Sequence, residues 1–265
     1  NFGILRAIKK TLVELDLAPH RVLMVSGIGQ AGKLPHYMRA NVFNSLHGRS
    51  LPVAIGAKIA NPELVVIAVG GDGDGYGEGG NHFLHAMRRN HDITYLVHNN
   101  QIYGLTKGQA SPTSDEGAIT KTTPEGAPQS LNPIGMAILA GARFVARAFV
   151  GDIDYVANLI QEGIHHHGFS LIDLLQPCVT FNHRNTFKWY RERVYKLDEE
   201  KGYDPADKNK ALEKAQEWGD RIPVGVIFKQ KRRSFEDGLP AIKKMSLVKQ
   251  KLSPVVIEDL IKDFE

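Results

Sequence analysis

The run from Gly71 to Gly80, with the sequence GDGDGYGEGG, is the segment best suited to chemistry. It follows an apolar stretch at 64–69, and Asn100 comes shortly after the next apolar stretch at 93–97. Magnesium prefers an octahedron of oxygen ligands, and Asp72 and Asn100 would present a carboxylate oxygen and an amide oxygen from two strand ends. The backbone N–H groups of a glycine loop and of a helix N-terminus can meet phosphate oxygens. The pattern therefore predicts a site for a diphosphate that is bridged by magnesium.

Three other interpretations of this loop leave more unexplained. The glycines from Gly75 onward match the dinucleotide pattern GxGxxG, but the next strand ends in asparagines, where that fold needs an acidic residue for the ribose. Asp72 and Asp74 would also repel a diphosphate that has no counter-ion. A calcium loop that starts at Asp72 would place Phe83 at its twelfth position, where a bidentate glutamate is required. A plain flexible turn seldom needs so many glycines.

The elements that must position these residues alternate between strand and helix. Short β-branched and apolar runs predict buried strands, and apolar residues at helical spacing predict helices between them. This alternation predicts an α/β fold with a mostly parallel sheet and helices on both faces, and such sheets bind ligands beyond the carboxyl ends of their strands. The predicted strands are 21–25, 64–69, 93–97, 143–149 and 170–175, and the predicted helices are 2–15, 51–60, 79–89 and 152–166.

Two further segments lack this alternation. Residues 104–133 are rich in Gly, Ser, Thr and Pro, and so long a loop in a compact domain is usually a lid or a binding segment. From about residue 180 the composition becomes aromatic and charged. We therefore expect a binding domain over residues 1–180 and an extension over residues 181–265 that packs on this domain or on a partner subunit.

Composition argues against several classes of protein. Lys and Arg total 33 against 29 Asp and Glu, so the small net charge gives no reason to expect a nucleic-acid partner. No apolar stretch reaches the roughly 18 residues that span a bilayer. No signal-peptide pattern opens the chain either, so we expect no membrane association and a cytoplasmic location. The apolar helical pattern begins directly after Asn1 without a cap, which suggests further residues upstream. The adjacent histidines 165–167 do not share a helix face, so exposure explains them better than metal binding.

Gly71-Asp-Gly73, followed by Asn99-Asn100, resembles the signature of thiamine diphosphate-binding proteins. The segments that flank this signature carry a more specific likeness. Together they resemble the β subunit of 2-oxoacid:ferredoxin oxidoreductases over roughly residues 1–185. The segments are Gly27-Ile-Gly29, Leu46-His-Gly-Arg49, Ala60-Asn-Pro62, Gly71-Asp-Gly-Asp74 and residues 103–113 with the sequence YGLTKGQASPT.

The resemblance implies a thiamine diphosphate-binding fold and a set of site residues. The magnesium ligands would be Asp72, Asn100 and the backbone carbonyl of Ile102. The residues implied around the cofactor are Ile28, Gly29, His47, Gly71, Asp72, Gly73, Asp74, Asn100, Gly104, Leu105 and Thr106.

The resemblance also implies an activity and partners. The reaction is the oxidative decarboxylation of a 2-oxoacid, of the 2-oxoglutarate or pyruvate type, with CoA to acyl-CoA, CO2 and reduced ferredoxin. A separate α subunit would carry the aminopyrimidine-binding domain and the glutamate that activates the cofactor. The expected assembly is a dimer of such heterodimers. Two alternatives stay open, namely half of another thiamine-dependent decarboxylase or synthase, and a nucleotide-binding regulatory module.

Three of the implied roles compete with simpler explanations. Lys33 follows a strand-end loop and would pair with the substrate carboxylate as a catalytic residue, but a solvated lysine at a helix start would look the same. His47 would face the diphosphate or satisfy a local hydrogen bond. Leu105 would lie beside the thiazolium or pack in the core.

The single cysteine limits iron chemistry in this chain. Many members of the family bind a [4Fe-4S] cluster through a CxxC pair just before the segment that matches Phe2, a third cysteine in the first strand-end loop, and a fourth in a Pro-Cys-Val-Thr-Phe segment. Here Gln30 occupies the third position, while Cys178 stands in the matching segment 177–181. Cys178 is thus either an iron–sulfur ligand or a buried small side chain, and cluster binding is in doubt.

Overall fold

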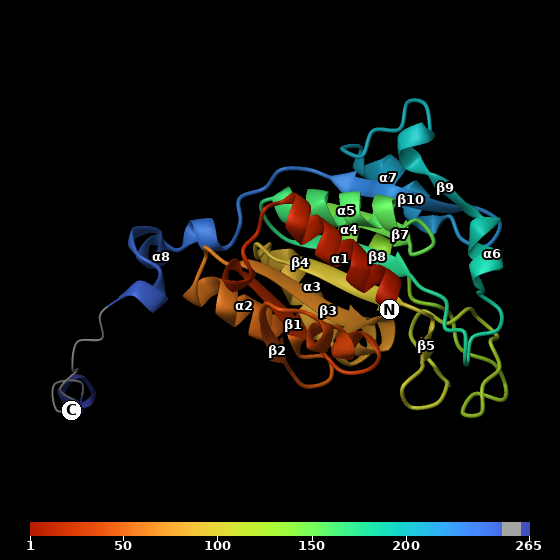
Figure 1. Cartoon of the computed structure of the whole chain (residues 1–265), viewed down its shortest axis with the longest axis horizontal. Helices are drawn as coiled ribbons and strands as arrows, with labels where there is room; N and C mark the ends of the chain where they lie inside the picture. Colours follow the sequence, from red (N-terminus) through yellow and green to blue (C-terminus); the bar gives the residue numbers. More distant parts are fainter. Residues whose placement is uncertain (251–260) are drawn as a thin grey trace.

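The computed structural model describes residues 1–250 and 261–265, and an eight-stranded sheet forms its centre (Figure 1). The strand order is β2-β1-β3-β4-β8-β7-β10-β9, and the pairs are parallel except for β10 against β7. The predicted α/β fold with a mostly parallel sheet is therefore confirmed. The strands are β1 Val22–Ser26, β2 Asn41–Asn44, β3 Val65–Gly71, β4 Thr94–Asn99, β7 Phe144–Phe149, β8 Ser170–Leu175, β9 Val194–Lys196 and β10 Ile222–Lys229, with β5 Ile102–Tyr103 and β6 Gln109–Ala110 forming a separate pair.

Helices cover both faces of the sheet. The longer ones are α1 Phe2–Glu14 and α5 Ile153–His165 on one face, and α2 Ser50–Ala60, α3 Gly80–Arg89, α4 Pro133–Ala140 and α7 Lys208–Gln216 on the other. In Figure 1, α1 and α5 lie side by side in front of the sheet. Successive residues of β3 alternate between the two cores: Ile67 and Val69 pack toward α1 and α5, while Val66 and Ala68 pack toward α2 and α3. This alternation explains why the strand is apolar throughout.

All five predicted strands and all four predicted helices exist, with ends that differ by a few residues at most. The elements that were not predicted have weak patterns. Every residue of β2 is exposed, since it is a short edge strand with asparagine at both ends. The α4 segment is apolar on all sides, so it shows no amphipathic period. It buries Ile134, Ala137 and Ile138 in the core that it shares with α3, α7 and the sheet.

The chain after residue 180 adds strands to the same sheet. β10 pairs with β7, and β9 pairs with β10 at the edge. A small core joins Phe149 and Leu175 to Tyr190 of α6 (Phe187–Arg191) and to two residues of β10. The short helix α8, Pro240–Lys244, lies to the left of α2 in Figure 1. The division of the chain into a domain over residues 1–180 and an extension over residues 181–265 stays a prediction.

Two smaller observations bear on the sequence analysis. Among the described residues, no helix is long and apolar enough to cross a membrane. The expected exposure of the histidine tract is wrong for His166, which is buried and whose ring lies 5.5 Å from that of Phe144. The helix α5 ends at His165, so the next residue is free to turn its ring inward.

Candidate cofactor site

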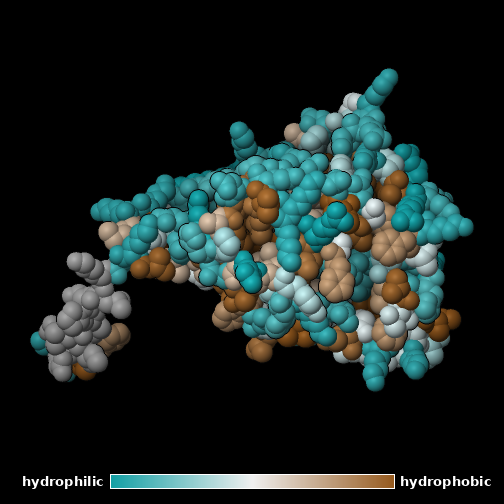
Figure 2. Space-filling model, in the orientation of Figure 1, coloured by the Kyte–Doolittle hydropathy of each residue, from teal (hydrophilic) through white to brown (hydrophobic). Residues whose placement is uncertain are grey.

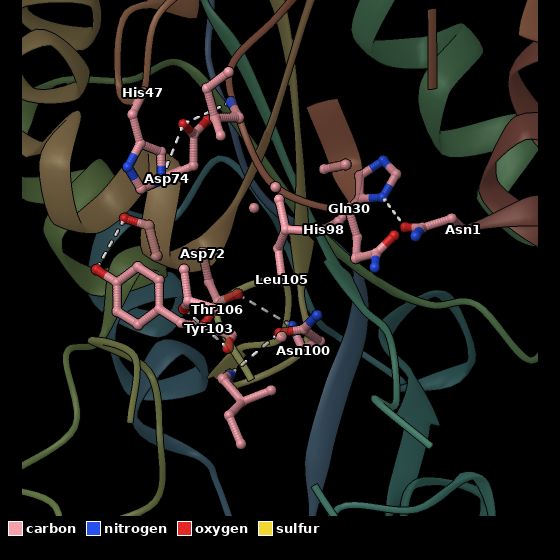
Figure 3. A pocket seen from close by; sticks show the side chains of 17 residues that line it. Asn1, Gln30, His47, Asp72, Asp74, His98, Asn100, Tyr103, Leu105 and Thr106 are labelled. Carbon is pink, nitrogen blue, oxygen red and sulfur yellow. Dashed lines mark hydrogen bonds and ion pairs between the residues drawn. The ribbon is translucent and has the colours of Figure 1, made fainter. Parts of the chain in front are cut away.

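A hollow of about 520 Å³, open to one side, lies where β1, β3 and β4 end (Figure 3). We call it the cofactor hollow. All the cofactor residues that the sequence predicted line it, together with Ile102. In Figure 3, Asp72 and Asn100 lie near Tyr103, Leu105 and Thr106, while His47 and Asp74 form a second group. The lining residues are Asn1, Ile28, Gly29, Gln30, Ala31, His47, Gly71, Asp72, Gly73, Asp74, His98, Asn100, Ile102, Tyr103, Gly104, Leu105 and Thr106.

Asp72 follows β3 directly and is held by the long loop after β6. Its Oδ2 atom accepts hydrogen bonds from the hydroxyls of Ser111 at 2.5 Å and Thr113 at 2.7 Å. Burial raises the pKa of this carboxyl, and the two hydroxyl donors oppose that shift by favouring the charged form. Part of the segment 104–133 thus orients this carboxylate, while its role as a lid or binding segment stays a prediction.

Asn100 stands next to Asp72 because β3 and β4 are neighbours in the sheet. The backbone N–H of Asn100 approaches Asp72 Oδ1 at 3.4 Å. The side-chain oxygen of Asn100 accepts a hydrogen bond of 3.1 Å from the backbone N–H of Ile102. Gln101, between them, adopts a positive φ of 58°, which turns the chain sharply at this point. The three residues that are predicted to bind magnesium therefore line one hollow.

Asp74 ties three loops together. Its Oδ1 atom accepts hydrogen bonds from the backbone N–H of Ile28 at 3.0 Å and of Gly48 at 2.8 Å. His47 Nε2 lies 3.6 Å from the same oxygen. Because this carboxylate binds the loop after β1 and the loop before α2 to the loop after β3, it shapes the hollow as well as lining it. Its Oδ2 atom is buried and has no hydrogen-bond partner among the residues that the structure describes.

The glycines of the acidic loop are required by close packing. A turn of π-helix, Gly73–Glu78, follows Asp72 and leads into α3. A Cβ atom on Gly73 would lie 2.2 Å from the ring of Tyr103, and one on Gly75 would lie 2.0 Å from the Tyr95 hydroxyl. A Cβ atom on Gly27, in the loop after β1, would lie 1.9 Å from Asp74 Oδ2. These glycines let side chains and backbone approach where any larger residue would collide.

Substituting Gly75 with alanine tests this packing. We expect Gly75→Ala to lower the free energy of unfolding by about 1–3 kcal/mol, since its methyl group would overlap the Tyr95 hydroxyl. The double variant Gly75→Ala/Tyr95→Phe lacks that oxygen, and we expect it to be more stable than the single alanine variant once the cost of Tyr95→Phe alone is subtracted. Urea unfolding of the four chains gives the coupling energy. Strict additivity would show that the overlap is not what excludes a side chain here.

Several lining residues were missed as site residues. Tyr103 donates hydrogen bonds to the Glu78 carboxylate at 3.2 and 3.3 Å, and its ring packs edge-on against His47 with the centroids 6.5 Å apart. His98 is buried and its Nδ1 atom lies 2.9 Å from Asn1 Oδ1, while burial lowers its pKa to about 3. The position of His98 directly before Asn99-Asn100 in the motif was the only signal in the sequence.

Two of the predicted residues do not line the hollow. Lys33 is exposed on a short 3-10 helix, Ala31–Tyr37, whose first residue does line it. Cys178 is partly buried just after β8 and is a free cysteine. A Cβ atom on Gly104 would lie 3.7 Å from its sulfur atom, so Cys178 lies behind the wall of the hollow.

The donor set of the hollow fits magnesium better than a softer metal. A carboxylate, an amide oxygen and a backbone carbonyl are hard oxygen donors. Among the described residues, no three His, Cys, Asp or Glu side chains are grouped so that they could hold a metal ion. The set formed by Asp72, Asn100 and Ile102 differs from such a group because it contains only one carboxylate. A [4Fe-4S] cluster needs four ligands of the cysteine type, and of these the printed sequence contains Cys178 alone.

Comparison with known proteins agrees with this geometry. Residues 24–174 match the family model "Thiamine pyrophosphate enzyme, C-terminal TPP binding domain", and residues 178–244 match the model for the C-terminal part of the pyruvate ferredoxin oxidoreductase beta subunit. The 2-oxoacid:ferredoxin oxidoreductase subunit beta of Saccharolobus solfataricus is 49% identical over 86% of this chain and 79% of its own length. The subunit beta of 2-oxoacid:ferredoxin oxidoreductase 1 from Aeropyrum pernix is 46% identical over 86% of this chain and 75% of its own length.

A solved structure extends the likeness to the whole chain. The 2-oxoglutarate:ferredoxin oxidoreductase from Magnetococcus marinus, with 2-oxoglutarate, coenzyme A and succinyl-CoA bound, superposes with a TM-score of 0.89 at 34% identity. The match covers 100% of this chain and 89% of the other. The fold, the thiamine diphosphate-binding domain and the sequence relatives therefore agree that this chain belongs to the family of 2-oxoacid:ferredoxin oxidoreductase beta subunits.

Proposed function

We propose that the cofactor hollow holds the diphosphate end of thiamine diphosphate through a magnesium ion bound by Asp72, Asn100 and the carbonyl oxygen of Ile102. The meeting of Asp72 and Asn100 at neighbouring strand ends is the observation that carries this proposal. Backbone N–H groups of the glycine loops that line the hollow would meet the phosphate oxygens. The alternative of a nucleotide-binding regulatory module has no support in the family to which the chain belongs.

We propose the oxidative decarboxylation of a 2-oxoacid with CoA to acyl-CoA, CO2 and reduced ferredoxin as the reaction of the complete enzyme. Thiamine diphosphate, when bound, would supply carbanion chemistry toward the 2-oxoacid. The residues of this chain bind and orient the diphosphate, and Leu105 and Thr106 form the wall on the side of β5. The relatives named for 2-oxoacids and the solved relative with bound 2-oxoglutarate support a substrate of the 2-oxoglutarate or pyruvate type.

The test of this proposal is reduction of ferredoxin by the purified complex. We expect ferredoxin reduction only when a 2-oxoacid, CoA, thiamine diphosphate and magnesium are all present. Comparison of 2-oxoglutarate with pyruvate at equal concentrations identifies the preferred acid. Decarboxylation that proceeds at the same rate without CoA and without ferredoxin would instead favour the alternative of a non-oxidative decarboxylase.

The shape of the site supports a partner subunit. The hollow is open on one side, and exposed apolar side chains lie on its rim and nearby, which is typical of a subunit interface. In Figure 2, hydrophobic side chains gather in the part of this face where Figure 1 places β1, β2, the N-terminus and β5. We propose that the α subunit docks here in a dimer of heterodimers. The exposed apolar residues are Phe2, Ile28, Tyr37, Val42, Phe43, Leu46 and Leu105.

We propose that Lys33 pairs with the substrate carboxylate when the site is closed by the α subunit. Lys33 is exposed, and its helix begins at the lining residue Ala31, so it lies near the mouth of the hollow. We expect Lys33→Ala to raise the KM for the 2-oxoacid by about tenfold, since one charge-assisted hydrogen bond would be lost. Lys9→Ala, which removes an exposed lysine from α1, is the matched control. An unchanged KM and kcat in Lys33→Ala would remove this role.

The iron–sulfur question needs a direct measurement. A [4Fe-4S] cluster requires four ligands of the cysteine type, of which Cys178 would be one, and Gln30 lines the hollow at the position of another. Iron and sulfide analysis of the purified complex, with Cys178→Ser as the comparison, decides whether this cysteine is a ligand or a packed side chain.

A further inference from the structure

A second pocket lies behind the cofactor hollow. It is formed by Asn99, Thr113, the segment 129–133, Arg147 and the end of α7 through Trp218. We call it the Arg147 pocket. Thr113 Oγ1 lies 2.9 Å from Asn99 Oδ1 in its wall and 2.7 Å from Asp72 Oδ2 on the other side. The two cavities are thus separated by a single layer of hydrogen-bonded side chains, and neither the family match nor the relatives assign a role to the second.

Arg147 is buried and poorly neutralised. It comes from the middle of β7 and is 3% exposed, and its Nε and Nη1 atoms have no hydrogen-bond partner among the described residues. Its nearest carboxylate is Asp173 on β8, at 3.7 Å from Nε. That distance is too long for a hydrogen bond. Leaving two buried guanidinium nitrogens without acceptors is costly, so the site favours an arrangement that supplies an acceptor and further negative charge.

Asp173 is already engaged with other donors. Tyr76 donates its hydroxyl to Asp173 Oδ1 at 2.9 Å, and Asn99 donates its amide to Oδ1 and Oδ2 at 3.1 and 3.3 Å. Burial raises the pKa of Asp173 to about 6, so this carboxylate is itself poorly solvated. Asp173 is therefore shared among several donors, and it approaches Arg147 only to 3.7 Å, without a hydrogen bond.

The rest of the pocket suits an anion. Of the described residues that line it, Arg147 carries the only full charge and none is acidic. The helix α4 begins at the pocket with Asn132 as its N-cap, so the positive end of the helix dipole contributes there. The ring of Trp218 lies 5.4 Å from the guanidinium carbon and forms an apolar wall over it. A water molecule could supply acceptors for Arg147, but it would add no negative charge to the pocket.

We propose that the Arg147 pocket binds a small oxyanion, a carboxylate or a phosphate group, through the guanidinium of Arg147. Both groups present paired oxygens that match the N–H donors of a guanidinium. The pocket encloses about 690 Å³ including its open mouth, so a free phosphate ion or a small dicarboxylate has room. The ligand would lie one side chain away from Asp72 through Thr113, yet its binding does not depend on the reaction at the cofactor hollow.

The test is calorimetric titration of the complete enzyme complex with inorganic phosphate and, separately, with succinate, in a buffer of low chloride. Thiamine diphosphate and magnesium are added first, because phosphate would also bind in the cofactor hollow. We expect saturable binding of at least one of the two anions. The anion that binds more tightly shows whether the pocket takes a phosphate group or a carboxylate. Since the readout is the heat of anion binding, failure of the cofactor assignment would be seen separately, in the initial titration with thiamine diphosphate.

Variants locate the binding. We expect Arg147→Met to weaken binding about tenfold or more, since the charge-assisted hydrogen bonds are lost. Gln129→Glu and Gln216→Glu change only exposed residues of the pocket, and we expect each to weaken binding by about fivefold through repulsion. Gln250→Glu makes the same change at an exposed residue that does not line the pocket.

Two results would overturn the proposal. The first is the absence of saturable binding of either anion to the unaltered complex. The second is binding that is equally strong in the pocket variants and in Gln250→Glu, which would place the anion elsewhere. If Arg147→Met fails to fold, the two glutamate variants still test whether the anion binds in this pocket, because their side chains lie outside the core.

Discussion

The complex that carries Asp72→Ala is expected to lose magnesium-dependent binding of thiamine diphosphate. The carboxylate is the one charged ligand that we propose for the metal, and it is already oriented by Ser111 and Thr113. Its removal should weaken retention of the cofactor by about 100-fold or more, which corresponds to about 2.8 kcal/mol or more. We expect Asn100→Ala to act in the same direction and less strongly, because an amide oxygen is a neutral ligand. Calorimetric titration with thiamine diphosphate, at several magnesium concentrations, measures both effects.

Two comparisons separate ligand loss from misfolding. Asp72→Asn keeps the shape of the side chain and retains an oxygen acceptor for Ser111 and Thr113, but it lacks the negative charge. Asp220→Asn makes the same change at an exposed position away from the hollow and should bind the cofactor normally. Unfolding curves without cofactor show whether the variants are equally folded. Undiminished magnesium-dependent binding in both Asp72→Ala and Asn100→Ala would refute the metal assignment.

The second large effect concerns the core under the acidic loop. Phe83 of α3 is fully buried, and its ring lies 5.1 Å from Tyr76, 6.0 Å from Tyr95 and 6.3 Å from Phe169, measured between centroids. We expect Phe83→Ala to lower the free energy of unfolding by about 3–5 kcal/mol, because it leaves a cavity among three rings. Urea unfolding of the full chain measures this loss, from the transition midpoint at constant slope.

The neighbouring residue offers a matched control. Leu84 is on the same helix and is 42% exposed, so Leu84→Ala removes a similar side chain with little loss of packing. We expect it to cost much less than Phe83→Ala. Because Tyr76 lies in the π-helical turn after Asp72, Phe83→Ala should also weaken cofactor binding. Equal effects of the two substitutions on stability would show that the aromatic cluster contributes little.

The strand-and-helix order could be predicted from the sequence because its signals are local. Apolar runs such as 64–69 and amphipathic helices such as 152–166 carry their period in consecutive residues, and the structure confirms them as β3 and α5. Elements that depend on their neighbours could not be found in this way. The edge strand β2 is exposed along its whole length, and it exists because β1 offers it backbone partners. β9 and β10 join the sheet only through pairing with residues far away in the chain.

The features of the candidate site likewise fall into those that the sequence predicted and those that it did not. The sequence by itself determined the residue types at the strand ends, and all the cofactor residues that the family likeness predicted line the hollow. Motifs follow contiguous backbone, so the residues that they name lie together around the hollow. The sequence did not reveal that Asp74 joins three loops, that Tyr103 excludes a side chain at Gly73, or that two buried nitrogen atoms of Arg147 lack acceptors.

Only the tertiary structure decided these points, because each depends on contacts between residues that are far apart in the chain. Thr113 lies 41 positions from Asp72, yet its hydroxyl donates to that carboxylate. Arg147 and Asp173 face each other because β7 and β8 pair in register, although the chain that connects these two strands runs through the whole of α5. The chemical type of each side chain is a property of the sequence. The burial of a side chain, its hydrogen-bond partners and the separation of the two cavities arise when the sheet brings distant segments together.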